Sequence, residues 1–332
     1  MAEPVAIILA AGESTRMKTS LAKVLHEVCG RAMLEYVVEA CRQAGVRKMY
    51  VVVGYGADQV KERFGDAEDI VWVNQPEQKG TAHAVMCCAG HLKDFTGQTF
   101  VLCGDAPLVR PETLRALVEK HRSERPAATL ATAVLDDPTG YGRIVRNDRG
   151  DITAIVEEAD CDDRQRAICE VNPSFYLFEN KVLFDVLEHV GCDNAKNEYY
   201  LTDVIAIMIK AGHRVCAVAA VAPEEAIGVN TRAQLGRAGA IMQRRIQQNL
   251  MDGGVTIVDP ANTWIDGSAQ VGPDTVIEPF TYIGPGVRIG RNCRVGPFAC
   301  LTDDTIIKDG QAVGPFGRPG SRPSYRENRD NG

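Results

Sequence analysis

A six-residue period in the C-terminal part of the chain limits what that part can fold into. Branched aliphatic residues recur at every sixth position without a gap: Ile265, Val271, Ile277, Ile283, Ile289, Val295, Leu301, Ile307 and Val313. Glycine directly follows five of them, at Gly272, Gly284, Gly290, Gly296 and Gly314. This period is typical of a β-helix, in which each short strand turns one apolar side chain inward and turn residues form the corners.

The repeat resembles the left-handed parallel β-helix of hexapeptide-repeat acyltransferases. That family uses three hexapeptides for each coil, so the resemblance implies about three coils here. We assign residues 255–317 to this short β-helix. Residues 318–332 are polar and rich in Arg, Asn, Pro and Gly, and we expect them to be disordered.

The N-terminal part, residues 1–230, alternates between strand and helix patterns. The sequence predicts strands at 5–9, 48–53, 70–74, 99–103 and 128–135, and helices at 32–44, 81–92 and 111–123. Such alternation favours an α/β, Rossmann-like and mostly parallel sheet, with ligands beyond the C-terminal ends of the strands. Residues 136–230 show a mixed pattern that extends the same domain. Residues 231–254 form a predicted linker helix, which Gly253 and Gly254 end.

Composition narrows the class of protein. The net charge is −7 with acids and bases intermixed, which argues against a nucleic-acid surface. No basic leader and no apolar run of about 20 residues is present, so we expect neither a signal peptide nor a membrane span. The eleven cysteines include no CxxC pair, which argues against zinc and favours reduced thiols. We expect a cytoplasmic protein.

The segment after the first strand, Leu9-Ala-Ala-Gly-Glu-Ser-Thr-Arg-Met17, has the features of a phosphate-binding loop. Its small residues let backbone N–H groups approach an anion, although a loop of this kind can also be purely structural. Arg16 can bind phosphate oxygens with both ends of its guanidinium, and Lys23 adds a point charge. The loop matches neither GxxxxGK[ST] nor GxGxxG, which excludes a P-loop ATPase and a dinucleotide-binding fingerprint.

This loop resembles the LAAGxGTRM…PK signature of sugar-nucleotide pyrophosphorylases. The chain is similar, over about residues 5–300, to the bifunctional N-acetylglucosamine-1-phosphate uridyltransferase and glucosamine-1-phosphate acetyltransferase family. The ordered segments that carry the likeness are 75–84, 104–108, 140–144, 156–157, 198–203 and 228–230. The resemblance implies an enzyme that joins UTP to N-acetylglucosamine 1-phosphate, forming UDP-N-acetylglucosamine and releasing pyrophosphate.

The resemblance also implies a set of site residues. Arg16 and Lys23 would stabilise the reacting phosphates, and Asp105 with Asn230 would bind Mg²⁺. The sugar would contact Gly140, Glu157 and Asn172. The nucleotide would contact Leu9, Ala11, Gly12, Gln75, Gly80 and Thr81. Read alone, Asp105 could be a turn carboxylate, Asn230 a helix cap and Glu157 or Gln75 a solvated side chain. We assign no catalytic role to His26 or His83, which match the family.

Three departures from the family pattern stand inside its motifs. Ser14 replaces a glycine, and Ala22 replaces the proline before Lys23. The family's Asn-Thr-Gly reads Asn172-Pro173-Ser174 here. A proline and a missing glycine are expected to affect the backbone beside the sugar, and therefore the sugar preference.

Two alternative functions remain open at this stage. One is transfer to another sugar 1-phosphate, such as glucose 1-phosphate with UTP or dTTP. The other is a non-catalytic assembly module built on the hexapeptide repeat. We expect a homotrimer held by the β-helix. We also expect no acetyl transfer, since the last histidine is His213 and no substitute base is evident among Asp303, Asp304 and Asp309.

Overall fold

The computed structural model describes residues 3–13, 15–219, 221–302 and 304–316. The chain divides into two compact units. The first comprises Met1–His26 and Ala32–Leu235, and the second comprises Glu27–Arg31 and Gly236–Gly332. Ser14 and the tail predicted to be disordered lie outside the described residues.

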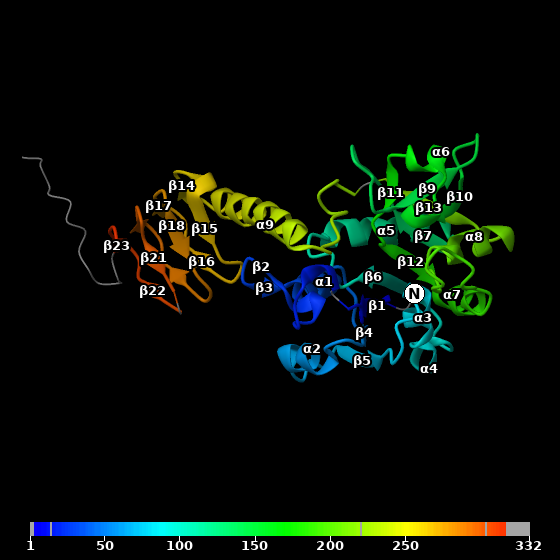
Figure 1. Ribbon diagram of the computed structural model, residues 1–332. Coiled ribbons are helices and arrows are strands. Elements are labelled where there is room, and N and C mark those ends of the chain that lie inside the picture. The colour runs from blue at the N-terminus through cyan, green and yellow to red at the C-terminus, as the bar shows by residue number, and fades with distance from the viewer. Residues whose placement is uncertain (1–2, 14, 220, 303, 317–332) are drawn as a thin grey trace, which may run out of the picture. The chain divides into compact units, whose positions relative to one another are not determined.

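A seven-stranded sheet forms the centre of the first unit (Figure 1), with the strand order β13-β7-β12-β6-β1-β4-β5. All neighbours pair in parallel except β12, which is antiparallel to both β6 and β7. This confirms the predicted mostly parallel α/β sheet. The strands are β1 Val5–Ala10, β4 Met49–Val53, β5 Ile70–Asn74, β6 Gln98–Cys103, β7 Ala128–Ala131, β12 Tyr176–Glu179 and β13 Val215–Val218.

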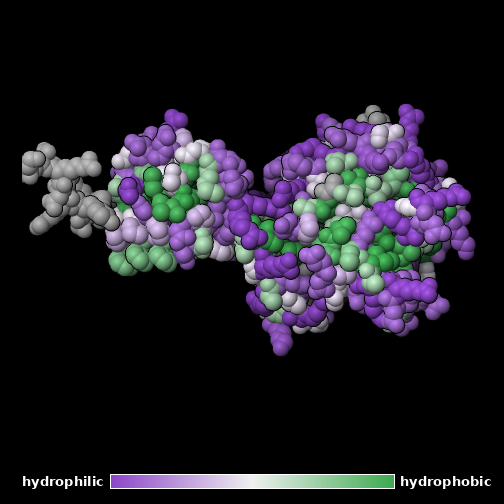
Figure 2. Space-filling model, turned by 90° about the horizontal axis from the view of Figure 1, so that it is seen from above, coloured by the Kyte–Doolittle hydropathy of each residue, from purple (hydrophilic) through white to green (hydrophobic). Residues whose placement is uncertain are grey.

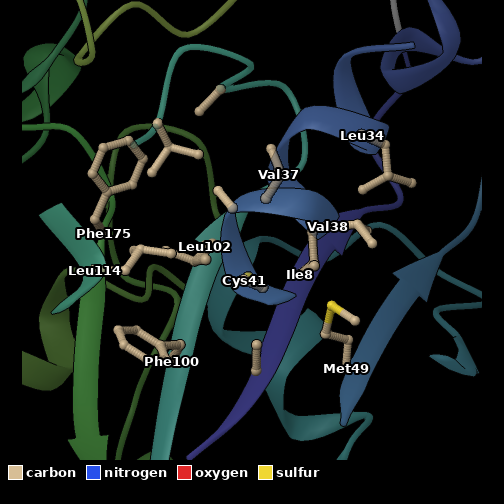
Figure 3. Close-up of a cluster of buried hydrophobic side chains, with 14 of the residues drawn as sticks. Ile8, Leu34, Val37, Val38, Cys41, Met49, Phe100, Leu102, Leu114 and Phe175 are labelled. Carbon is tan, nitrogen blue, oxygen red and sulfur yellow. The ribbon is translucent and has the colours of Figure 1, made fainter. Parts of the chain in front are cut away.

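Apolar side chains cover both faces of this sheet, because successive residues of a strand point to opposite sides. In β1, Ala6 and Ile8 belong to one buried cluster, whereas Val5 and Ile7 belong to the other. Figure 3 shows part of the first cluster. The helices of this unit are α1 Met33–Gln43, α2 Ala57–Phe64, α3 Thr81–Met86, α4 Ala89–Leu92, α5 Pro111–Glu124, α6 Asp163–Arg166, α7 Asn180–Leu187 and α8 Asp203–Lys210.

Two predicted elements are each divided in the structure. The helix predicted for 81–92 is interrupted at Cys87 and Cys88, where the amide of Cys88 bonds the carbonyl of Val85, three residues back. The strand predicted for 128–135 supplies β7 to the large sheet and β8, Ala133–Val134, to a second sheet. That second sheet has the order β10-β9-β11-β8 and is antiparallel, with β9 Gly142–Arg146, β10 Ile152–Val156 and β11 Glu170–Asn172.

The hexapeptide repeats of the second unit form three parallel sheets, which confirms the predicted short β-helix. Ile265 pairs with Ile283, and Ile283 pairs with Leu301, three hexapeptides apart along the chain. Eight of the nine periodic residues are buried, and Val271 is half-buried. The strands are β14 Thr256–Ile257, β15 Thr263–Ile265, β16 Gln270–Val271, β17 Val276–Ile277, β18 Thr281–Ile283, β19 Arg288–Ile289, β20 Arg294–Val295, β21 Cys300–Leu301, β22 Ile306–Ile307 and β23 Ala312–Val313.

The long helix α9, Arg232–Asp252, leads into the β-helix. Ile246 and Leu250 pack against the apolar interior of the repeats. The chain leaves the helix through Gly254, whose φ of +90° suits glycine. A short hairpin of β2, Glu27–Val28, and β3, Arg31–Ala32, precedes α1. Among the helices that the structure describes, none is long and apolar enough to cross a membrane.

Candidate active site

A pocket lies where the carboxyl ends of β1 and β6 meet. These strands are parallel neighbours, with Leu9 opposite Cys103. The sheet continues from β1 through β4 and β5 on one side, and β6 lies on the other side. The loops that follow β1 and β6 therefore run in opposite directions and leave a crevice between them. The pocket encloses about 810 Å³, including space open to solvent. It is lined by all six predicted nucleotide-binding residues, Leu9, Ala11, Gly12, Gln75, Gly80 and Thr81, and by Lys23 and Asp105.

Gln78 holds the loop that follows β1. Its Nε2 donates to the carbonyl oxygen of Ala11 at 2.8 Å, and its Oε1 accepts from the amide of Glu13 at 3.4 Å. Between these two residues, a Cβ added at Gly12 would meet no atom within 4 Å. The backbone at Gly12 is therefore open to a ligand on this side, as an anion-binding loop requires. Sequence reasoning did not assign a role to Gln78, although it lies in the family segment 75–84.

Lys23, Asp105 and Asn230 come together beside this loop. The ammonium of Lys23 contacts Oδ2 of Asp105 and lies 2.6 Å from Oδ1 of Asn230. Asn230 is brought here by the backbone, since the amide of Val229 donates to the carbonyl of Asp105 at 2.9 Å. Nδ2 of Asn230 donates to the carbonyl of Gly228 at 3.3 Å, which leaves Oδ1 directed to Lys23.

Arg16 adds a second cation to this group. Its Nη2 donates to the same Oδ1 of Asn230 at 2.8 Å. The side chains of Lys23 and Asp105 are only 15% and 19% exposed, so their charges are partly shielded from water. Arg16, Lys23 and Asp105 together carry a net charge of +1, which favours a polyphosphate, and Glu198 adds a second carboxylate to the pocket lining.

Asp105 and Asn230 are suited to Mg²⁺. Their side-chain oxygens converge on one cation, the ammonium of Lys23, and both are the hard ligands that Mg²⁺ prefers. The described residues include no cluster of three His, Cys, Asp or Glu side chains able to hold a metal. Mg²⁺ retains waters and takes phosphate oxygens, so two protein oxygens are a sufficient set for it.

The second sheet brings two of the predicted sugar residues together. Asn172 of β11 is opposite Gly142 of β9, and Glu157 directly follows β10. A Cβ added at Gly142 would lie 3.7 Å both from Asn172 Cβ and from Glu157 Oε1. Burial raises the pKa of Glu157, and a hydrogen bond from Thr202 Oγ1 at 3.1 Å opposes that shift. Gly140, the third residue, donates its amide to Glu158 Oε2 at 3.2 Å.

The Asn172-Pro173-Ser174 segment forms a tight turn. Oδ1 of Asn172 accepts from the amide of Ser174 at 3.0 Å, and its Nδ2 donates to the hydroxyl of Tyr176 at 2.5 Å. Ser174 has a φ of +64°. Glycine adopts this left-handed conformation without strain, whereas other residues adopt it at a cost of about 1 kcal/mol. Serine thus takes a glycine-like backbone conformation at this position.

Cys103, at the end of β6, interacts both with residues predicted to bind phosphate and metal and with a residue predicted to bind the sugar. It lines the pocket, and its pKa is raised to about 12 by burial and by the charge of Asp105, while Lys23 lowers it. Its thiol also interacts with the Ser174 side chain and feels the charge of Glu157. Sequence reasoning missed Cys103, although it directly precedes the Gly104-Asp105 motif.

Comparisons with known proteins identify the family. A MobA-like NTP transferase domain model matches residues 6–197, and a bacterial transferase hexapeptide model with six repeats matches residues 262–303. The chain is 44% identical to the bifunctional protein GlmU of Brevibacillus brevis, over 96% of this chain and 72% of that protein. It is 48% identical to GlmU of Geobacillus thermodenitrificans, over 90% of this chain and 64% of that protein. The chain therefore belongs to the GlmU family and is a nucleotidyltransferase with hexapeptide repeats.

Proposed function

We propose that this chain forms UDP-N-acetylglucosamine and pyrophosphate from UTP and N-acetylglucosamine 1-phosphate. A phosphate oxygen of the sugar 1-phosphate attacks the α-phosphorus of UTP, and the bond from that phosphorus to the α–β bridging oxygen breaks. Pyrophosphate leaves with the electron pair. The observation that carries the proposal is the convergence of Arg16, Lys23, Asp105 and Asn230 beside the open loop at Gly12.

Charge repulsion is the main obstacle to this reaction. Two unit charges about 5 Å apart repel by ~3 kcal/mol at an effective dielectric constant of about 20, and several such pairs form between the substrates. Lys23 offsets the charge of the attacking phosphate near the α-phosphorus, and Arg16 that of the departing pyrophosphate. Catalysis then consists of positioning and electrostatic stabilisation, with no protein nucleophile.

Asp105 and Asn230 would hold Mg²⁺ in this proposal. When bound, the ion supplies positive charge to the phosphate oxygens. The two oxygens that would ligate it both contact Lys23 in this structure, so the ammonium would leave them for a phosphate oxygen. The lysine thus serves as a counterion for Asp105 when it does not contact substrate.

The sugar would bind beside the second sheet, at Gly140, Glu157 and Asn172. A carboxylate accepts hydrogen bonds from sugar hydroxyls, and the Asn172 amide both donates and accepts. Glu157 and Asn172 flank Gly142, and a Cβ at that position would crowd Ile155 at 3.1 Å. Cys103 interacts with Asp105 and Lys23 as well as with Ser174 and Glu157, which fits one substrate that spans both groups.

The second unit would assemble the enzyme as a homotrimer. Phe280, Phe298 and Phe316 are 54%, 47% and 86% exposed, and successive rings stack at 5.1 and 5.8 Å. Figure 2 shows apolar atoms along one edge of this unit. Association would cover such a surface. Light scattering at micromolar concentration should give the mass of three chains, and the mass of a single chain would contradict the proposal. The Phe298→Ser substitution should make the trimer dissociate.

These 332 residues would not acetylate glucosamine 1-phosphate. Acetyl transfer to an amine needs a general base, and no histidine follows His213. Asp309 is one of the carboxylates that could replace the histidine as a base, but its Oδ1 accepts a hydrogen bond from the amide of Arg291 at 2.8 Å. Release of free CoA thiol from acetyl-CoA above the enzyme-free rate would contradict this.

All eleven cysteines are free, which favours a reducing compartment such as the cytoplasm.

Pyrophosphate release tests the main proposal. The protein should release pyrophosphate with UTP, Mg²⁺ and N-acetylglucosamine 1-phosphate, and much less with glucose 1-phosphate, glucosamine 1-phosphate or dTTP. A preference for glucose 1-phosphate would assign another sugar to the site. No release with any pair in this panel would reject the nucleotidyl transfer itself.

A further inference from the structure

Two acceptors fix the orientation of the Gln75 carboxamide. Gln75 directly follows β5 and is only 5% exposed. Its Nε2 lies 3.2 Å from the carbonyl oxygen of Gly80 and 3.0 Å from Nδ1 of His83 on α3. A carbonyl oxygen can only accept a hydrogen bond, so the amide nitrogen, and not the amide oxygen, must face Gly80.

This orientation also fixes the tautomer of His83. One hydrogen of Nε2 goes to Gly80, which leaves the other for Nδ1. Nδ1 is therefore the acceptor and carries no proton, so the neutral imidazole is protonated on its own Nε2. The frame around these groups is tight. Gly80 has a φ of +108°, and a Cβ there would lie 2.5 Å from the carbonyl oxygen of Tyr199. Tyr199 in turn bonds the backbone of Lys79 and Ala82 at 2.8 and 2.9 Å.

The remaining atom, Oε1 of Gln75, makes no hydrogen bond to any residue that the structure describes, and Gln75 lines the pocket. This side chain therefore offers the pocket an acceptor and no donor. Uracil and thymine present an N3–H donor between two carbonyl groups. Cytosine presents an unprotonated N3, which is an acceptor, at the same position. An acceptor held here suits the first two bases and opposes the third.

We propose that His83 is a positioning residue that selects a 2,4-dioxopyrimidine base over cytosine by holding the Gln75 amide in this orientation. The inference rests on the proposed UTP site. A half-turn of the amide would place Oε1 against two acceptors, the Gly80 carbonyl and His83 Nδ1, and both hydrogen bonds would be lost. The turned amide would offer its NH₂ to N3 of cytosine. His83 thus acts through Gln75 and does not touch the nucleotide.

Equilibrium binding of UTP and CTP, each with Mg²⁺, tests this in the full chain and two variants. His83→Leu removes the acceptor. His83→Asn places an amide oxygen at the same number of bonds from the backbone as Nδ1. We expect wild type to bind UTP at least ~10²-fold more tightly than CTP. His83→Leu should reduce this ratio about tenfold, mainly by weakening UTP, as expected for one hydrogen bond. His83→Asn should restore most of it. His91→Leu, on the exposed side of α4, is the matched control and should leave the ratio unchanged.

The outcomes separate this inference from the proposed function. An unchanged ratio in His83→Leu, or an equal loss for both nucleotides, would overturn it. So would a wild type without preference for UTP. Selective UTP binding without pyrophosphate release would reject the proposed reaction and leave the role of His83 standing. Nitrogen-15 NMR of the wild-type histidines gives a second readout that needs no variant. His83 Nδ1 should show the shift of an unprotonated ring nitrogen, and a protonated Nδ1 would overturn the inference.

Discussion

Lys23 and Asn230 are 207 positions apart in the sequence, yet Nζ of the first lies 2.6 Å from Oδ1 of the second. The backbone bond from Val229 to Asp105 holds this pair in place. The same ammonium contacts Asp105, so one cation neutralises the carboxylate that would hold the metal. A substitution of Lys23, Asp105 or Asn230 therefore changes the electrostatic environment of the other two side chains.

Replacing Lys23 with alanine should lower kcat about 10²–10³-fold, since removal of one preorganised electrostatic group has a cost of this size. The fold should persist, because the lysine lines the pocket and does not belong to the apolar clusters of the core. Pyrophosphate release gives the rate, and circular dichroism checks the fold. The matched control is Lys93→Ala, an exposed lysine at the end of α4, which should keep the wild-type rate. Near wild-type turnover in Lys23→Ala would remove the lysine from the mechanism.

Chelation with EDTA should abolish pyrophosphate release, and Mg²⁺ in excess should restore it, because the phosphates need a cation that Asp105 and Asn230 hold. Asp105→Ala should raise the Mg²⁺ concentration needed for half-maximal rate and lower kcat by a further ~10²-fold. Asp58→Ala, on α2, serves as the control for loss of a carboxylate. Full activity in EDTA-treated protein would contradict a metal requirement.

Glu157→Gln should raise the thermal stability near pH 7 while weakening binding of the sugar 1-phosphate. Burial raises the pKa of Glu157 in the folded protein above its usual value. Folding therefore favours the protonated carboxyl. The associated stability is fully present below the usual pKa and is lost as pH rises through the raised one. Glutamine avoids that loss.

The melting temperature of Glu157→Gln should thus exceed that of wild type at pH 7, and the difference should shrink toward pH 4. Glu119→Gln, on the exposed side of α5, should show no such dependence on pH. A variant that is less stable than wild type at pH 7 would show that the ionised carboxylate stabilises the fold.

Ile283→Ala should destabilise the second unit by about 2–5 kcal/mol, the usual cost of a cavity at a fully buried aliphatic residue. Ile283 has a partner in both the preceding and the following coil, Ile265 and Leu301, which limits collapse around a cavity. Denaturant unfolding measures the loss. Val258→Ala, 53% exposed in the same unit, should cost less than about 0.5 kcal/mol. Equal losses for the two variants would contradict the inward placement of Ile283.

The β-helix could be predicted nearly residue by residue, because a fixed period leaves one apolar position in each hexapeptide and strand pairing then follows from counting. The sheet of the first unit could be predicted as a class of fold, since buried parallel strands such as β1 appear as short apolar runs. The order of the strands in that sheet could not be predicted, because it depends on contacts between segments that are distant in the sequence. The helix predicted at 81–92 was interrupted at Cys87 and Cys88 by a backbone bond that has no sequence signature.

The candidate site shows the same limit. Motifs indicated which residues to consider, and the structure links Arg16, Lys23, Asp105 and Asn230 by a chain of hydrogen bonds through Asn230 and Lys23. Their roles remain predictions. Cys103, Gln78 and the pairing of Gln75 with His83 could not be identified, since ordinary residue types acquire these contacts only through the packing of neighbouring loops.

Strand pairing across three hexapeptides has a consequence for engineering the length of the second unit. Adding or deleting one whole coil would keep every remaining strand on the same sheet and every periodic residue facing inward. A single hexapeptide added would rotate all later strands to a different sheet while keeping them apolar inside. One added residue would turn the buried residues outward unless it formed a loop at a corner. Insertions in this unit should therefore be designed in whole coils or confined to the corners.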